Sequence, residues 1–372
     1  MKICVDAQSA IAQHAGVGRY TRILVEYLDR RESEHELSLC YFDFRRRARA
    51  ISVQKARTKV VRWCPGALAE QAWKRVNFPP YEWFAGKADL FHFPNFTMPP
   101  LHSGKSIVTI HDMSFARYPQ FAEDRNLRNL EARIPDTVAR ADAIITISNF
   151  SAGEIESLLN VPREKIYPIP LGISQDFTRA SDADIAEAQQ RLSLTRPYLL
   201  FVGTIEPRKN ISFLVDVFDQ LTDFDGDLVL VGRPGWKSEA TMARIEASPH
   251  HDRIRLLDSV GDADLCAVYS GATLFVIPSH YEGFGFPPLE AMACGTPVVS
   301  SAGGSLPEVL GSAACIVEGF EAPDWCETIS ALLRDNTRRD QLVEAGYARA
   351  RSFQWDTTAE QTWALYEKVL GS

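Results

Sequence analysis

Two carboxylates enclose a glycine-rich loop in the second half of this sequence. Glu282 and Glu290 stand on either side of Gly283 and Gly285, and Pro287-Pro288 follows the glycines. Proline is favoured in the first turn of a helix, so a helix is expected to begin here. Glycines let backbone N–H groups approach a ligand closely, and a helix start favours phosphate oxygens. Carboxylates accept hydrogen bonds from hydroxyls, so the segment fits a sugar and a ribose on either side of phosphate.

The two carboxylates differ in what else could explain them. We place Glu290 in the first helical turn, where the helix dipole stabilises an acid even without a ligand. Glu282 precedes the helix and has no such explanation. Gly295 is well placed to end this helix.

Two adjacent cations follow another strand of the same half. Arg208 and Lys209 come shortly after the apolar run Tyr198–Gly203. Cations at the start of a helix oppose its dipole, so a merely solvated helix start explains them poorly. Arg208 can chelate a phosphate and Lys209 can add a point charge, so we expect both to bind an anion.

The first half offers weaker candidates. His111 and Asp112 end the strand Ser106–Ile110, Asn95 follows the strand Leu90–Phe93, and a glycine turn begins at Gly16. Ligands of open α/β sheets bind beyond the carboxyl ends of strands, which favours a site role for these residues. A structural role is the alternative for each. The glycine turn lacks the third glycine of a dinucleotide fingerprint, which argues against an NAD oxidoreductase.

Strand and helix signals alternate along the whole chain and predict an α/β protein with two doubly wound parallel sheets. We expect a Rossmann-like domain over residues 1–173, a linker region over 174–196 and a second Rossmann-like domain over 197–354. The two domains are expected to face each other across a cleft. The amphipathic C-terminal segment 355–372 is expected to pack back on the first domain.

Composition and charge narrow the class of partner. The 372 residues carry a net charge of −8, and no recognised nucleic-acid motif is present, so nucleic acid is an improbable partner. One basic segment stands out: residues 44–62 hold eight cations and no acid, and aromatic residues follow. This pattern suits an anionic membrane surface, with a solvated loop as the alternative. Seven scattered cysteines and no long apolar run predict a cytoplasmic protein, with peripheral membrane contact.

The segment from Glu282 through Val298 resembles the retaining GT-B glycosyltransferases of family 4 (glycosyl transferases group 1), which carry a Glu, seven residues, Glu pattern in a Gly-Phe-Gly loop. The run Gly203–Asn210 also fits a family pattern. The resemblance implies that Glu282 contacts the donor sugar and Glu290 the nucleotide ribose. It further implies donor contacts from these residues: Gly16, Gly203, Val260, Gly283, Phe284, Gly285 and Leu289.

The same resemblance implies a mechanism with retention of anomeric configuration. Arg208 and Lys209 would neutralise the departing diphosphate, and His111 would face the transferred sugar. Asn95 and Asp112 are candidates for contacts with the acceptor or the sugar. Since charge stabilisation by these groups suffices, no cofactor or metal is expected beyond the nucleotide-sugar co-substrate.

Donor and acceptor follow less directly. The His111–Pro119 stretch and residues 148–151 resemble bacterial mannosyltransferases, which favours GDP-mannose, with UDP-sugars as the alternative. The expected base contacts are main-chain groups near Gly232 and 259–260. The basic segment favours a lipid-linked saccharide acceptor in polysaccharide or lipopolysaccharide biosynthesis. A sugar-nucleotide epimerase, a phosphorylase and a non-catalytic nucleotide-sugar-binding protein are the rival functions.

Overall fold

The computed structural model describes residues 1–372 apart from 13–15, 49–50, 259 and 372. The chain forms two compact units. The first comprises 1–116, 125–172 and 354–372, and the second comprises 117–124 and 173–353. Residues 117–124 therefore belong to the second unit, although they lie well inside the first half of the chain. The region 174–196 is also part of the second unit.

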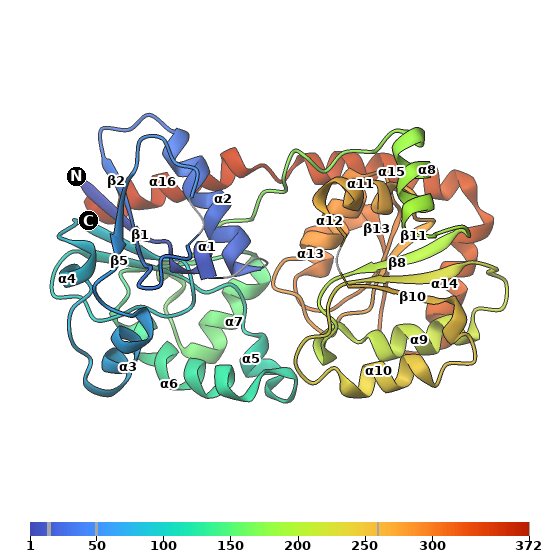
Figure 1. Ribbon diagram of the computed structural model, residues 1–372, viewed down its shortest axis with the longest axis horizontal. Helices are drawn as coiled ribbons and strands as arrows, with labels where there is room; N and C mark the ends of the chain where they lie inside the picture. Colours follow the sequence, from blue (N-terminus) through green and yellow to red (C-terminus); the bar gives the residue numbers. More distant parts are fainter. Residues whose placement is uncertain (13–15, 49–50, 259, 372) are drawn as a thin grey trace. The chain divides into compact units, whose positions relative to one another are not determined.

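The first unit is built on a parallel sheet, of which Figure 1 labels β1, β2 and β5. The sheet has seven strands in the order β3-β2-β1-β4-β5-β6-β7. Its strands are β1 (Lys2–Asp6), β2 (Glu36–Phe42), β3 (Arg57–Val61), β4 (Leu90–Phe93), β5 (Lys105–Thr109), β6 (Ala143–Thr146) and β7 (Ile166–Pro168). Apolar runs in the sequence predict six of these strands to within a residue or two: Lys2–Asp6, Leu37–Phe42, Leu90–Phe93, Ser106–Ile110, Ala143–Ile147 and Ile166–Ile169. The edge strand β3 was not predicted, because its sequence, Arg-Thr-Lys-Val-Val, is half polar and exposed. Part of the basic segment is thus a strand, and reading all of it as a loop is wrong.

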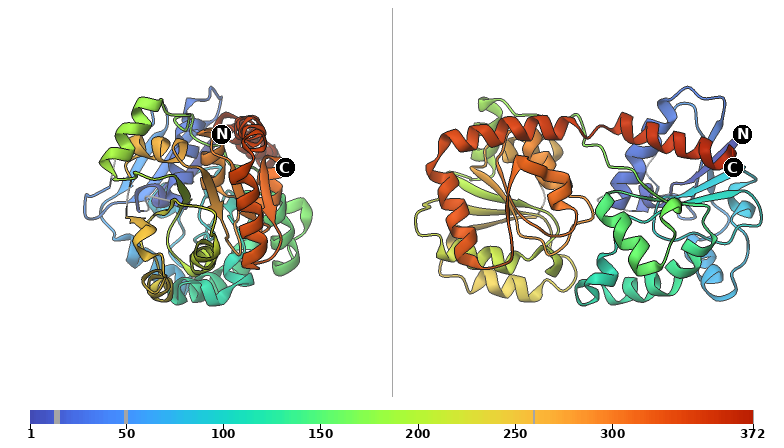
Figure 2. Two further views of the ribbon diagram at one scale, coloured as in Figure 1. Left: turned by 90° about the vertical axis from the view of Figure 1, so that its right-hand side faces the viewer. Right: turned by 180° about the vertical axis from the view of Figure 1, so that it is seen from behind.

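Helices cover the sheet of the first unit. They are α1 (Gln8–Ala12), α2 (Val17–Arg30), α3 (Gly66–Val76), α4 (Glu82–Ala85), α5 (Ser114–Arg117), α6 (Asp124–Arg140), α7 (Asn149–Leu159) and α16 (Trp355–Gly371). The C-terminal helix α16 packs against α2, as the two views in Figure 2 also show. The indole Nε1 of Trp363 donates to the carbonyl of Leu28 in this contact.

One predicted helix cap is wrong. Ser151 is followed three residues later by Glu154, a spacing that predicts a capping box with Ser151 as the N-cap. In the structure Ser148 is the N-cap of α7, and its Oγ accepts the backbone N–H of Ser151 at 3.1 Å. Ser151 and Glu154 both lie inside the helix. The run of alternative caps Ser148-Asn149-Phe150-Ser151 left the start ambiguous by one turn.

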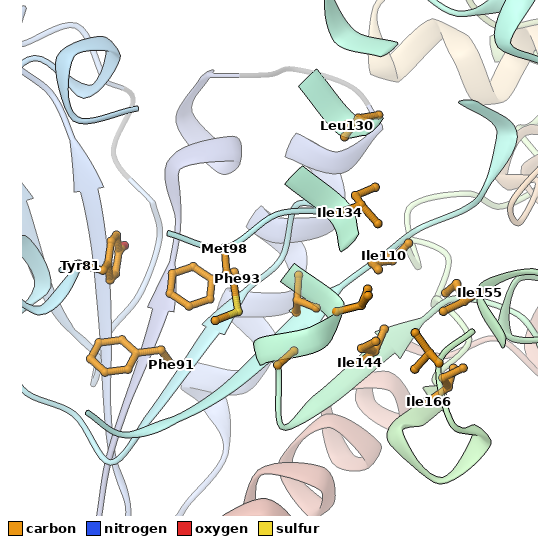
Figure 3. Close-up of a cluster of buried hydrophobic side chains, with 14 of the residues drawn as sticks. Tyr81, Phe91, Phe93, Met98, Ile110, Leu130, Ile134, Ile144, Ile155 and Ile166 are labelled. Carbon is orange, nitrogen blue, oxygen red and sulfur yellow. The ribbon is translucent and has the colours of Figure 1, made fainter. Parts of the chain in front are cut away.

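The core of the first unit lies between the sheet and its helices (Figure 3). Phe91 and Phe93 of β4 are buried beside Tyr81, whose ring meets that of Phe93 edge-on with centroids 5.1 Å apart. Ile134 of α6 and Ile144 of β6 extend the same apolar cluster. The strands β4, β5 and β6 are apolar on both faces because helices cover both.

The second unit contains a six-stranded parallel sheet with the order β10-β9-β8-β11-β12-β13. Its strands are β8 (Tyr198–Val202), β9 (Asp227–Val231), β10 (Ile254–Leu257), β11 (Leu274–Ile277), β12 (Val298–Ser301) and β13 (Ala314–Val317), each predicted from an apolar run. Its helices are α8 (Asp182–Arg191), α9 (Ile211–Gln220), α10 (Glu239–Glu246), α11 (Asp262–Ser270), α12 (Phe286–Ala293), α13 (Leu306–Leu310), α14 (Ala322–Arg334) and α15 (Asn336–Arg351). β8 and β11 are neighbours at the centre.

Candidate functional site

The predicted donor residues follow β8 and β11, the two central strands of the second unit. Arg208 and Lys209 lie in a 3₁₀ turn, Pro207–Lys209, between β8 and α9. Glu282 lies in the loop between β11 and α12. Because neighbouring parallel strands end at the same edge of a sheet, the structure brings these three side chains together.

The three side chains form a buried charge cluster. Nζ of Lys209 lies 2.5 Å from Oε1 of Glu282, and the guanidinium of Arg208 donates to Oε2 of the same carboxylate at 3.0 Å. Ser279 Oγ adds a third donor, 2.7 Å from Oε1. Glu282 is 6% exposed and Lys209 is 8% exposed. The sequence suggested separate roles for the carboxylate and the cations, whereas in the structure they pair with one another.

The charges of the cluster decide the ionisation of Glu282. Burial alone would raise the pKa of this carboxyl group. The ammonium of Lys209 and the guanidinium of Arg208 outweigh burial and lower its pKa to about 2. Glu282 is therefore ionised at neutral pH, and an arriving anion meets two cations that are already paired.

Glu206 is a fourth member of the cluster that the sequence analysis missed. It is 2% exposed, and its Oε1 accepts a hydrogen bond from the guanidinium of Arg208 at 2.5 Å. Its other oxygen, Oε2, is buried without a hydrogen-bond partner among the described residues. Arg208 also donates to the carbonyl of Tyr281 at 2.6 Å, so its guanidinium is held on three sides. The signal in the sequence was an acid two residues before Arg208, inside a motif already singled out.

The backbone of the loop that carries Glu282 is fixed by a second loop after β12. Ser305 donates to the carbonyl of Glu282 through its N–H at 2.9 Å and through its Oγ at 3.0 Å. Gly304 pairs with Glu282 in an isolated β-bridge and has φ +67°. A Cβ on Gly304 would lie 2.4 Å from that carbonyl oxygen, so only glycine fits here.

Glu290 lies one residue further into α12 than predicted, because the helix begins before the two prolines. The helix begins at Phe286, so Glu290 is past the first turn and dipole stabilisation does not explain it. It is 3% exposed, and Tyr269 Oη donates to its Oε2 at 3.0 Å. The helix start is also a poorer phosphate site than expected, because two of its first residues are prolines without an N–H.

The remaining donor candidates of the second unit are backbone positions. Gly203 directly follows β8 and packs closely against Gly232. A Cβ on Gly232 would lie 1.9 Å from the Gly203 carbonyl oxygen. Gly285, with φ +109°, caps α12. The side chains of Phe284 and Leu289 are buried, and Gly283 is buried beside them, so a ligand could reach these residues only through their backbone. Val260 is half-buried, and its neighbour 259 lies outside the described residues.

His111 in the first unit has a defined tautomer. Its Nε2 lies 2.9 Å from the carbonyl oxygen of Pro94, which only accepts, so the proton is on Nε2 and Nδ1 is an acceptor. The ring of Tyr20 meets the imidazole edge-on, with centroids 4.8 Å apart. Burial lowers the pKa of His111, while the Pro94 carbonyl and Asp112 raise it in part.

The other first-unit candidates have partners or exposure of their own. Asp112 Oδ1 accepts the backbone N–H of Ser114 at 2.9 Å, at the start of α5. Asn95 is exposed after β4. Gly16 is exposed, has φ +56° and is the N-cap of α2. Asn95, His111 and Asp112 thus follow the carboxyl ends of strands in the first unit, and Gly16 begins helix α2.

No group of three or more His, Cys, Asp or Glu side chains suited to a metal ion occurs in the part of the chain that the structure describes. Within those same residues, every helix is too short or too polar to cross a bilayer.

Comparisons with known proteins agree with this geometry. A family model described as "Glycosyl transferases group 1" matches residues 182–349, and "Glycosyltransferase Family 4" matches 14–177. The chain is 34% identical over 301 residues to an O-antigen chain mannosyltransferase B of Escherichia coli, covering 80% of this chain and 77% of that one. It is 28% identical over 298 residues to a D-inositol 3-phosphate glycosyltransferase of Actinosynnema mirum, covering 76% and 70%.

Solved structures show the fold. Sucrose-phosphate synthase from Thermosynechococcus elongatus superposes with a TM-score of 0.77 at 23% identity, covering 100% of this chain and 99% of that one. The fold is therefore GT-B, with two Rossmann-like α/β units in one chain.

Proposed function

The chain belongs to glycosyltransferase family 4 of the glycosyl transferases group 1, and we propose that it transfers mannose from GDP-mannose, with retention of configuration, to a saccharide acceptor. The acceptor we propose is lipid-linked and serves polysaccharide or lipopolysaccharide biosynthesis. The 34% identity to an O-antigen chain mannosyltransferase supports the sugar and the pathway class.

The buried cluster of Arg208, Lys209 and Glu282 is the observation that carries the proposal. At the end of β8 and β11, these two cations are paired with two carboxylates, those of Glu282 and Glu206. A diphosphate that binds here takes the place of the carboxylate of Glu282 as the partner of the cations. The carboxylate released from them becomes an acceptor for sugar hydroxyls, so one rearrangement serves both ends of a nucleotide sugar.

The same groups favour departure of the diphosphate. As the bond between the sugar C1 and the β-phosphate oxygen breaks, negative charge grows on that oxygen, and Arg208 and Lys209 stabilise it. The acceptor hydroxyl attacks C1 on the same face, and its proton passes to the departing phosphate oxygen. The products are the lengthened saccharide and a nucleoside diphosphate, so no protein nucleophile or cofactor is required.

Tyr269 and His111 complete the assignments. Glu290, held by Tyr269, is proposed to accept the ribose hydroxyls. His111, a neutral acceptor at Nδ1, is proposed to receive a hydroxyl of the transferred sugar. Gly16, Asn95 and Asp112 are proposed on the acceptor side.

A UDP-sugar is the second candidate donor. The base is expected to meet mainly main-chain groups near Gly232 and Val260, which discriminate weakly between guanine and uracil. The likeness to a D-inositol 3-phosphate glycosyltransferase also supports an acceptor other than an O-antigen saccharide.

A donor screen tests the proposal. The full chain is incubated with GDP-mannose, GDP-fucose, UDP-glucose and UDP-N-acetylglucosamine, and released nucleoside diphosphate is measured with and without lipid-linked saccharide. We expect GDP release from GDP-mannose to exceed release from the other donors by at least tenfold. Preference for a UDP-sugar would replace the mannosyl assignment, and no diphosphate release from any donor would overturn transfer itself.

A further inference from the structure

Large exposed apolar side chains gather in one stretch of the first unit. Among the described residues, the chain exposes large apolar side chains within residues 63–83 at Trp63 (69%), Leu68 (61%), Val76 (66%), Phe78 (51%) and Trp83 (62%). We call these five residues, together with the cations Arg62, Lys74 and Arg75, the aromatic–basic face. Scattered exposed apolar residues need no explanation, but a contiguous set marks an interaction surface.

The aromatic–basic face is built on α3, α4 and the residues around them, including those that follow β3. Helix α4 contacts β3, and Trp73 of α3 meets Phe84 of α4 edge-on with ring centroids 5.8 Å apart. Trp63 stacks on Phe84 with ring centroids 5.3 Å apart, and Phe78 meets Trp83 edge-on at 5.0 Å. Phe84 is 3% exposed, so the stacking fixes Trp63 against the core while its outer side stays in water. The apolar side chains are thus held outward by packing.

Helix α3 also leaves large apolar side chains exposed to water. Of its eleven residues, Ala69 is the one that is fully buried, and Leu68 and Val76 are more than half exposed. An eleven-residue helix is marginal without a partner for its apolar face. Its surroundings within the first unit therefore leave a surface that a further partner would cover.

The charge around these side chains selects the partner. Arg62, Lys74 and Arg75 are exposed, and among the described residues no ion pair to a carboxylate engages them. Exposed cations continue into the neighbouring segment at Arg45, Arg46, Arg47 and Lys59. Charges on the edge strand β3 also discourage edge-to-edge pairing, but that role does not account for tryptophans beside them.

We propose that the aromatic–basic face docks on an anionic lipid bilayer. Trp63 and Trp83 would lie at headgroup level, where indoles are favoured, while Leu68 and Phe78 reach the acyl boundary and the cations meet lipid phosphates. A second copy of this chain is a poorer occupant, because two positively charged faces repel one another. The inference deepens the proposed lipid-linked acceptor by naming the surface that brings the enzyme to it.

Vesicle co-sedimentation tests the docking. The full chain is mixed with vesicles of phosphatidylcholine alone, or with 30 mol% phosphatidylglycerol (roughly a typical anionic content), at low and high salt. We expect binding only to the anionic vesicles, weakened by salt. Binding to neutral vesicles alone, or to neither kind, would overturn the inference.

Two variants locate the surface. Arg62→Gln/Lys74→Gln/Arg75→Gln is expected to weaken anionic-vesicle binding by roughly 100-fold, at about fivefold for each charge. Trp63→Ser/Trp83→Ser is expected to abolish penetration, seen as loss of the tryptophan blue shift. Since all five of the substituted residues are exposed, the circular dichroism spectra of both variants should match that of the parent protein.

The matched control removes three exposed cations from the second unit, as Arg191→Gln/Arg196→Gln/Arg334→Gln. If the control loses as much vesicle binding as the first-unit variant, net charge rather than this face is responsible and the inference fails. If Trp63→Ser/Trp83→Ser instead dissolves a dimer seen by analytical ultracentrifugation, a second copy is the occupant. Vesicle binding without nucleoside diphosphate release in the donor screen would overturn the proposed function and leave the docking intact.

Discussion

Nζ of Lys209 lies 2.5 Å from Oε1 of Glu282, although the two residues are 73 positions apart in the chain. The contact is possible because β8 and β11 are neighbours and end at the same edge of the sheet. In the proposed mechanism, the diphosphate of the donor replaces Glu282 as the partner of Lys209.

Lys209→Met removes one cation while keeping a chain of similar length. The turnover rate at saturating donor should fall by roughly 10²–10³, as when one preorganised donor to a developing charge is lost. Lys237→Met is the control, because Lys237 is an exposed lysine of the same unit that pairs with Asp124. Near-normal release of nucleoside diphosphate by the Lys209 variant would contradict the assignment.

Glu282→Gln should affect the affinities for product and donor differently. With the carboxylate neutralised, Arg208 and Lys209 lose their anionic competitor, so free GDP should bind several-fold more tightly. The intact donor loses an acceptor for its sugar hydroxyls and should gain less or bind more weakly. Calorimetric titration with each compound measures both effects. Weaker GDP binding in the variant would mean that Glu282 assists the diphosphate site.

Glu206→Gln tests whether the missed carboxylate positions Arg208. Glutamine keeps the shape of the side chain but weakens its hold on the guanidinium, and turnover should fall roughly 10- to 100-fold, as small misplacements of a catalytic group do. The free energy of unfolding should also fall, because the variant takes a buried carboxylate partner from the guanidinium of Arg208. Glu206→Asp, which keeps the charge, should retain more activity than Glu206→Gln if positioning by charge is the role.

The pH dependence of turnover should report His111. Burial lowers the pKa of its imidazole below the ordinary value near 6.5, so the ring stays neutral and Nδ1 stays an acceptor at neutral pH. As the pH is lowered through 6.5, kcat/KM should therefore stay constant. It should fall only at lower pH, where His111 gains a proton. A profile of kcat/KM from pH 4.5 to 9 measures this limb.

The variant Asp112→Asn tests whether the acid limb of that pH profile belongs to His111. Asp112 raises the pKa of His111, so its neutralisation should move the acid limb to still lower pH. A shift to higher pH, or a limb above pH 6.5 in the parent enzyme, would show that another group controls the rate.

Gly304→Ala should disrupt the loop that holds Glu282. Its φ of +67° is strained for alanine and the new Cβ would meet the Glu282 carbonyl, so the second unit should lose about 1–3 kcal/mol of stability along with activity. Gly153→Ala, in α7 with nothing within 4 Å of the new Cβ, should instead stabilise by about 0.5–1 kcal/mol. Urea denaturation of both variants makes the comparison, and equal effects would argue against a built loop.

Much of the fold was predictable because its strands are buried on both faces and read as apolar runs. The edge strand β3 escaped prediction because one side is solvent-exposed and carries Arg57 and Lys59. The N-cap of α7 escaped because Ser148 and Ser151 are both good caps one turn apart. The grouping of residues 117–124 with the second unit depends on contacts such as Trp236 Nε1 to the Phe121 carbonyl, which no local pattern encodes.

The candidate site was likewise predictable from the sequence only in part. Motif spacing indicated Glu282, Arg208 and Lys209, but their mutual pairing is a tertiary property of two sheet neighbours. Glu206 was missed because an acid beside cations usually lies in solvent, and only its burial shows otherwise. Glu290 was misplaced by one residue, which put it past the first turn, because helix boundaries are the least certain feature of a sequence pattern.

A crystal of the full chain soaked with GDP tests the central claim most directly. The account predicts density for the β-phosphate within hydrogen-bond distance of the side chains of Arg208 and Lys209, with Glu282 displaced from at least one of them and the ribose beside Glu290. Density for the diphosphate elsewhere, with the Lys209–Glu282 contact unchanged, would contradict it.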